Sequence, residues 1–192
     1  MKPRFFVAVM IVAFVSATGA SAKSANCAFD REALLKLDYR SFDQDTQGGW
    51  RALASKGCDR EAADLIRDWR LQHNDSRYIL FWHEGQSRAF DGDYETAANL
   101  FEQSRRPAED RIGWNFYVDG SVAFLRGDMA KLQTARASLA QMPKPVDWDM
   151  MKGADGKLLN AKWPVNLNVL DGLIRCWRQH YRDAYGCPHQ TP

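Results

Sequence analysis

Apolar positions recur with helical spacing through the middle of the chain. Between Ile79 and Phe90 the apolar residues fall on more than one side of a helix, which predicts a helix that is buried on several faces. Gly92 then ends this helix, because glycine readily adopts the left-handed conformation that closes a helix, and Asp93 is placed to cap the next one. The second helix has an apolar stripe with 3.6-residue spacing, formed by Tyr94, Ala97, Ala98, Leu100 and Phe101. The pattern predicts a helix–turn–helix hairpin.

The turn of this hairpin recurs at a constant interval. Three glycines are each 35 residues apart, namely Gly57, Gly92 and Gly127. Seven residues before the second and third of them lie Gly85 and Gly120, and a glycine inside a helix allows a neighbouring helix to approach closely. An interval of this length is typical of stacked helical hairpins.

The middle unit resembles the tetratricopeptide repeat, a helical hairpin of about 34 residues. The matching residues, at the spacing of the family, are Gly85, Gly92, Asp93, Tyr94, Ala97 and Phe101. The third unit matches at Gly120, Gly127, Asp128 and Leu132, but Arg136 replaces its aromatic residue. The first unit is the weakest, with Trp50 in place of glycine and Cys58 in place of aspartate. The resemblance covers residues 43–142 and implies an all-α array of about three hairpins.

Both ends of the chain depart from the repeat. Near the N-terminus, Ala28 to Leu37 predicts a short helix that Asp30 caps. Residues 143–165 contain three prolines and two glycines, which predicts a long surface loop. After it, an amphipathic helix over 166–186 is expected to cap the open end of the array. Its apolar residues are Leu170, Leu173, Ile174, Trp177, Tyr181 and Ala184.

The first 22 residues have the pattern of a secretory signal peptide. Two basic residues precede an apolar run, Phe5 to Val15, and the A-x-A cleavage signal ends at Ala22. The run is too short to span a bilayer, which needs roughly 20 residues. Cleavage after Ala22 leaves one domain, residues 23–192, with no second apolar stretch of membrane-spanning length. The sequence therefore predicts a periplasmic protein.

Loss of the signal peptide also balances the charge of the chain. Two of its 26 basic residues leave with the signal, so that 24 face 24 acidic residues. No basic stripe remains for nucleic acid or anionic lipid.

All four cysteines lie in the exported part: Cys27, Cys58, Cys176 and Cys187. An even number in an oxidising compartment predicts two disulfides, for which three connectivities are possible, with free buried thiols as the alternative. Cys27–Cys58 would tie the N-terminal arm to the first hairpin. Cys176–Cys187 requires the chain to fold back, because an unbroken helix to Ala184 would leave Cys176 roughly 12 Å from its end.

Candidate chemistry is sparse, and we expect neither a metal nor a cofactor. His83-Glu84 begins like a helical zinc motif, but Ser87 occupies the place of the second histidine. We therefore expect His83 to be a partly buried, hydrogen-bonded histidine. The four acidic residues near the N-terminus lack the ligand pattern of a calcium hand and are expected in helix caps and a solvated turn. They are Asp30, Asp38, Asp43 and Asp45.

The resemblance implies a concave groove lined by the first helix of each hairpin. By register its residues are Arg51, Trp82, Gln86, Phe90, Trp114, Tyr117, Ser121 and Phe124. Tryptophan, tyrosine and arginine are common anchors of binding surfaces. The alternative is that Trp82, Phe90 and Phe124 are core residues, and we expect Trp114 and Tyr117 to be more exposed than these three.

The function predicted from these features is a noncatalytic module that binds a protein or peptide segment in the groove. One alternative is an envelope hydrolase or lyase that acts on glycans, with Asp147 and Asp149 as its acid and base. Such an enzyme would need two carboxylates roughly 5 to 10 Å apart in an aromatic cleft. Another is a structural assembly factor that uses the last helix, Leu170 to Tyr185, as its contact surface.

Overall fold

The computed structural model describes residues 26–107, 110–152 and 156–187, and throughout this part the chain is all-α, as predicted. Its one β pairing in these ranges is an isolated antiparallel bridge between Lys152 and Leu158. The predicted signal peptide lies outside the described residues. The elements are α1 (Arg31–Leu35), a π-helix (Arg40–Gln44), α2 (Arg51–Ala54), α3 (Asp59–His73), α4 (Tyr78–Asp91), α5 (Tyr94–Gln103), α6 (Trp114–Leu125), α7 (Met129–Ala140), a 3-10 helix (Trp148–Met150), α8 (Leu167–Arg175) and α9 (Tyr181–Tyr185).

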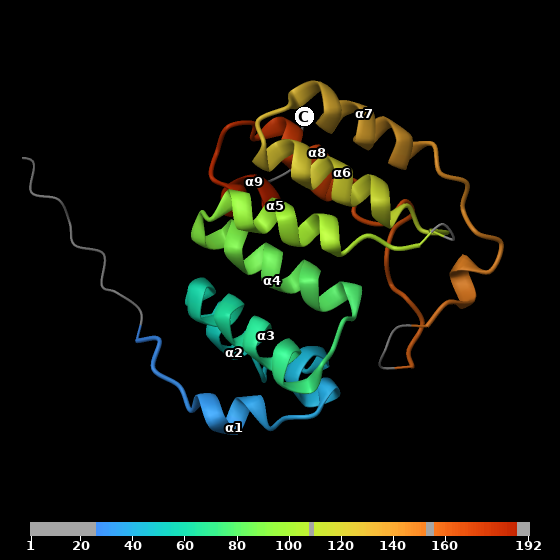
Figure 1. Ribbon diagram of the computed structural model, residues 1–192. Helices are drawn as coiled ribbons and strands as arrows, with labels where there is room; N and C mark the ends of the chain where they lie inside the picture. Colours follow the sequence, from blue (N-terminus) through green and yellow to red (C-terminus); the bar gives the residue numbers. More distant parts are fainter. Residues whose placement is uncertain (1–25, 108–109, 153–155, 188–192) are drawn as a thin grey trace, which may run out of the picture.

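Helices that follow one another in the chain also pack against one another. From α3 to α7 each helix contacts the next, and Figure 1 shows the five lying side by side in chain order. Helix α8 packs on α6 and α7, and α9 packs on α4 and α8. The two C-terminal helices therefore cover one face of the stack. In the described ranges no helix has the length and apolar character needed to cross a bilayer.

The three glycines of the 35-residue interval occupy equivalent turns. Gly57, Gly92 and Gly127 have φ values of +77°, +92° and +72°, and they precede α3, α5 and α7. Glycine is favoured there because it has no Cβ to clash in the left-handed conformation. After Gly92, the Asp93 carboxylate accepts a hydrogen bond from the Thr96 amide, as predicted for a capping residue. The interval thus marks a recurring helix–turn–helix junction.

Gly85 allows α4 and α5 to approach closely, as its position in the sequence predicts. A Cβ at this position would lie 2.8 Å from a ring carbon of Phe101. Gly120 serves another pair of helices, because a Cβ there would lie 2.6 Å from Leu170 of α8. The absence of a side chain at Gly120 therefore lets α8 pack closely on α6.

Two hydrophobic clusters form the core. The N-terminal cluster surrounds Trp69, whose ring stacks on Phe42 with centroids 4.6 Å apart. The C-terminal cluster surrounds Trp82 and Tyr181 and includes both C-terminal helices. Ile79, at the start of α4, packs against both clusters and links them.

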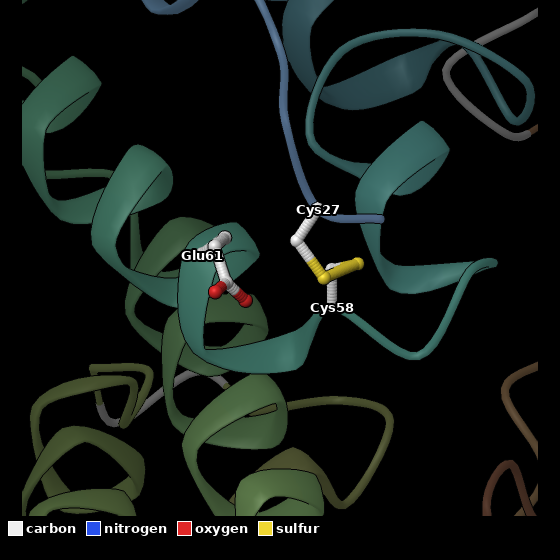
Figure 2. A group of neighbouring side chains, drawn as sticks. All are labelled: Cys27, Cys58 and Glu61. Carbon is white, nitrogen blue, oxygen red and sulfur yellow. A yellow bond between two sulfur atoms is a disulfide. The ribbon is translucent and has the colours of Figure 1, made fainter. Parts of the chain in front are cut away.

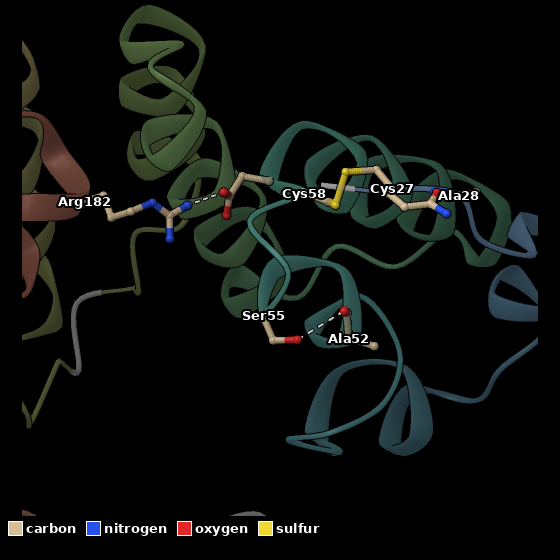
Figure 3. The surroundings of a disulfide bond; sticks show 8 residues. Cys27, Ala28, Ala52, Ser55, Cys58 and Arg182 are labelled. Atoms are coloured by element: carbon tan, nitrogen blue, oxygen red, sulfur yellow. Dashed lines mark hydrogen bonds and ion pairs between the residues drawn. A yellow bond between two sulfur atoms is a disulfide. The ribbon is translucent and has the colours of Figure 1, made fainter. Parts of the chain in front are cut away.

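The two predicted disulfides are formed, and of the three possible connectivities the structure has Cys27–Cys58 and Cys176–Cys187. The first ties the N-terminal arm to the start of α3 (Figure 3). The second shows that the segment predicted as one helix over 166–186 is two helices. An unbroken helix would separate Cys176 and Cys187 by roughly 16 Å at 1.5 Å per residue. Their Cα atoms are 6.1 Å apart, because the chain turns back between α8 and α9.

The segment predicted as a loop, residues 143–165, contains the 3-10 helix and the isolated bridge in its described part. The loop is anchored by two tryptophans, Trp148 and Trp163, whose rings pack edge to face at 4.9 Å. Trp163 Nε1 also donates a hydrogen bond to the Met142 carbonyl oxygen at 3.1 Å.

Candidate functional site

Most of the predicted groove is buried in the protein's own core. Five of the eight predicted groove residues are at most 8% exposed, namely Trp82, Trp114, Tyr117, Ser121 and Phe124. The ring of Tyr181, at the start of α9, lies 5.7 Å from Phe90 and 5.8 Å from Phe124. Burial raises the pKa of Tyr181 well above its usual value. These aromatic residues are therefore core, which is the alternative that the sequence left open for Trp82 and Phe124.

Trp114 and Tyr117 were expected to be the more exposed residues of the groove, but both are buried. Trp114 packs edge to face on Trp82 at 5.0 Å, and its Nε1 donates a hydrogen bond to the Ser104 carbonyl oxygen at 2.8 Å. Tyr117 is 2% exposed, whereas Phe90 is only half-buried. Trp114 is covered by α4 and the end of α5, whereas Tyr117 lies between Trp82 of α4 and the tyrosines of α9. The repeat pattern of one segment does not encode these contacts.

The three remaining groove residues line one pocket together. Arg51, Gln86 and Phe90 face a cavity of about 300 Å³ between α2 and α4. Its other lining residues are Thr46, Trp50, Ala54 and Ser87. The repeat register therefore identified three residues of an open pocket. This pocket lies at the end of the predicted groove that α9 leaves uncovered.

Arg51 is held at this pocket by Trp50 and by the backbone. Its guanidinium carbon lies 4.2 Å from the centre of the Trp50 ring, a cation–π contact, and its Nε donates a hydrogen bond to the Asp43 carbonyl oxygen at 3.0 Å. Burial lowers the pKa of Arg51, an effect that Asp43 and Tyr39 partly offset. Among the described residues no carboxylate lies within 4.0 Å of this guanidinium, so its outer donors are available to a ligand.

The Asp43 carboxylate, which the sequence placed in a solvated turn, is fully buried behind this pocket. It accepts a hydrogen bond from Trp50 Nε1 at 3.0 Å, and its Oδ1 lies 2.7 Å from Nδ1 of His83. Burial alone would raise the pKa of Asp43, but the hydrogen bond and charge of His83, followed by Trp50 and Arg51, hold it below its ordinary value. The prediction for His83, a partly buried and hydrogen-bonded histidine, is confirmed.

The other three acidic residues behave as predicted. Asp30 accepts a hydrogen bond from the Ala33 amide, Asp38 from the Ser41 amide and Asp45 from the Gln47 amide. What distinguishes Asp43 is a partner 40 residues away in the chain. A local pattern carries no signal for such a contact.

The carboxylates of the glycan-hydrolase alternative are bound to cations of the same chain. Asp147 pairs with Arg111 at 2.6 Å, and Asp149 pairs with Lys144 at 2.8 Å. The hydrogen bond from Arg111 lowers the pKa of Asp147. A general acid of a glycosidase needs the opposite shift, so this geometry weighs against the alternative.

The assembly-factor alternative requires an exposed apolar face on the segment from Leu170 to Tyr185, but this face is buried. Leu170, Leu173, Tyr181 and Ala184 are fully buried against the chain's own core.

One cluster has the spacing of metal ligands. The sulfur atoms of Cys27 and Cys58 and a carboxylate oxygen of Glu61 lie within 4.8 Å of one another (Figure 2). The two sulfurs are joined in a disulfide, whereas a metal ligand must be a thiolate. The cluster is accounted for by the disulfide.

A second pocket lies where α8 turns into α9. It encloses about 530 Å³ and is lined by Tyr94, Phe124, Leu125, Gly127, Trp177, Arg178, Gln179 and His180. A third, of about 440 Å³, lies over α6 and α7 and contains Glu102 and Arg126, which face each other at 3.8 Å.

These features define an all-α, disulfide-bonded protein of sequentially packed helix pairs, with surface pockets that combine aromatic and basic side chains. No protein-family model matches the chain, and neither a curated protein nor a solved structure matches it.

Proposed function

We propose that the protein is a noncatalytic periplasmic module that binds an extended peptide segment of a partner protein, with the pocket between α2 and α4 as its binding site. The observation that carries the proposal is Arg51, a half-buried arginine on the face of Trp50 that forms no ion pair within 4.0 Å among the described residues. An arginine in this setting is suited to a carboxylate of a ligand, and the adjoining Phe90 to an apolar side chain.

Two further observations support the class of protein and its location. The recurring glycine turns and the close packing at Gly85 agree with tetratricopeptide-like hairpins, a fold that in other proteins holds peptide segments. The two disulfides are consistent with an oxidising compartment, as the signal-like N-terminus predicts.

The proposal is tested by selecting peptides that bind the mature protein from a displayed library and measuring their affinity. We expect the selected peptides to contain an acidic residue beside an apolar one. Substitution of that acidic residue by its amide should weaken binding about tenfold, because a hydrogen-bonded charge pair is lost.

On the protein side, Arg51→Gln should produce the same loss, and Gln86→Ala a smaller one. Gln86 makes no side-chain hydrogen bond with the described residues, so its truncation leaves the fold intact. The matched control is Arg40→Gln, which changes an exposed arginine outside the pocket. Equal affinity for all three variants and the wild type would refute the assignment of this pocket.

A further inference from the structure

The turn between α8 and α9 contributes four consecutive side chains to one pocket. Trp177, Arg178, Gln179 and His180 line the cavity of about 530 Å³ opposite Phe124 and Leu125. Aromatic and aliphatic side chains form one part of its wall, and the side chains of the turn bring hydrogen-bond donors to the other. A ligand that fills it must offer an apolar group and a polar group close together.

The backbone of this turn is held in an unfavourable conformation. Arg178 has a φ of +66°, and the other non-glycine residues with positive φ among those described are asparagines, Asn74 and Asn166. Asparagine tolerates this region, whereas an arginine side chain disfavours it. Residues held in such conformations cluster at ligand-binding positions, because the surrounding structure has to impose them.

Contacts on both sides of the turn impose this conformation. The Cys176–Cys187 disulfide closes the segment, and the Tyr181 amide donates a hydrogen bond to Tyr94 Oη at 3.0 Å. The next residue, Arg182, pairs with the buried Asp59 at the start of α3 (Figure 3). The position of Arg178 at the pocket is therefore preorganised.

The charge of Arg178 is not balanced within the described part of the chain. Its side chain is exposed and forms no ion pair there, unlike most of the other arginines. The carboxylates next to the pocket in the sequence are already used, since Asp93 caps α5 and Asp128 both caps α7 and pairs with Lys131. An anionic group of a ligand would supply the missing partner.

We propose that this pocket binds the C-terminal residue of a peptide. The apolar side chain of that residue packs against Phe124, Leu125 and Trp177, and its α-carboxylate pairs with the Arg178 guanidinium. A C-terminal residue carries both groups on one Cα atom, which matches an apolar wall that directly adjoins the donors of the turn. The inference shares with the proposed function only the class of ligand, a peptide, and concerns a different pocket.

The test compares two labelled hexapeptides that end in leucine, one with a free carboxylate and one with a C-terminal amide, and a second such pair that ends in phenylalanine. Their affinities for the full mature chain are measured by fluorescence anisotropy. We expect the free acid to bind about tenfold more tightly than the amide, because only the acid pairs with Arg178.

Arg178→Gln should remove the difference between acid and amide. Arg178→Gly should do the same while retaining the fold, since glycine favours positive φ. Arg40→Gln, on an exposed arginine elsewhere, and Arg51→Gln, in the other pocket, should both leave the difference unchanged. A tenfold difference that persists in Arg51→Gln thus separates this inference from the proposed function.

Three results would overturn the inference: equal binding of acid and amide, an acid preference that survives in both Arg178 variants, or no binding of either pair. Competition by acetate at the same concentration as the peptide would also overturn it, because the apolar side chain would then contribute nothing.

Discussion

At the scale of single residues, the buried carboxylate of Asp43 organises the candidate pocket. This carboxylate joins the π-helix to Trp50 and to His83 of α4. The backbone carbonyl oxygen of Asp43 accepts a hydrogen bond from Arg51. A buried charge is costly unless it is paired and hydrogen-bonded, so each of these contacts is part of what makes the arrangement stable. The candidate binding residue Arg51 depends on a neighbour that never touches the pocket.

This arrangement predicts a specific dependence of stability on pH. The folded-state pKa of Asp43 lies below the unfolded value of about 3.9, so its contribution is present above that value and is lost as the pH falls through the folded-state pKa. Asp43→Asn should reduce the free energy of unfolding by about 1–3 kcal/mol at pH 7. The difference between variant and wild type should shrink below about pH 4.

Urea unfolding at a series of pH values measures both effects. Asp45→Asn is the control, since Asp45 is an exposed turn residue that lies two positions along the chain. A loss of stability in Asp43→Asn that is the same at pH 7 and pH 3 would contradict the role of the charge.

At the scale of elements, α9 is the piece that closes the predicted groove. Tyr181 is fully buried and packs against Phe90, Phe101 and Phe124. The α8–α9 segment covers part of the face that the sequence predicted as a groove. The open pockets lie beside it, one bordered by Phe90 and the other by Phe124.

The contribution of Tyr181 should come from its ring and not from its hydroxyl group. Tyr181 Oη is buried beside the Ser121 hydroxyl but forms no hydrogen bond of ordinary geometry with the described residues. Tyr181→Phe should therefore change the free energy of unfolding by less than about 1 kcal/mol. Tyr181→Ala should cost about 3–5 kcal/mol, because it leaves a cavity in the C-terminal cluster. Thermal and urea unfolding of the two variants test this, and a large loss in Tyr181→Phe would show that the hydroxyl is bonded after all.

At the scale of the whole molecule, each hydrophobic cluster contains one disulfide. Cys27–Cys58 lies at the N-terminal cluster, and Cys176–Cys187 lies at the C-terminal one. The clusters are connected through Ile79 and through the ion pair of Arg182 with Asp59. One disulfide therefore restrains the N-terminal end of the stack, and the other restrains the pair of helices that covers its face.

The two disulfides should differ in how much they stabilise the protein. They close loops with sequence separations of 31 and 11 residues, and the chain-entropy model assigns about 1 kcal/mol more to the longer loop. Replacing Cys27 and Cys58 by serine should lower the unfolding free energy by about 3–4 kcal/mol, and replacing Cys176 and Cys187 by about 2–3 kcal/mol.

Urea unfolding of the two double variants measures this difference. Intact-mass measurement with and without reductant provides the control, because reduction should add about four protons to the wild type and two to each double variant. The reverse order of stabilities would mean that loop-closure entropy does not govern these bonds.

Local chemistry made much of the fold predictable. Asp30 and Asp93 were identified as caps because a capping side chain bonds an amide three residues away. Gly85 was predicted to allow a close approach because a glycine leaves no side chain between the backbones of two helices. The candidate pocket was only partly predictable: Arg51, Gln86 and Phe90 were found by register, whereas Trp50, Asp43 and His83 depend on the N-terminal segment folding back onto α4.

The sequence by itself determined the helical class and the positions of the glycine turns, because both rest on backbone preferences within a few turns of helix. The even number of cysteines predicted two disulfides but left their connectivity open. Only the tertiary structure decided that Tyr181 fills the groove, that the last helix is broken after Arg175 and that Asp43 is buried. An apolar stripe specifies that a face is buried, but not which distant segment buries it. That choice depends on the packing of the whole chain.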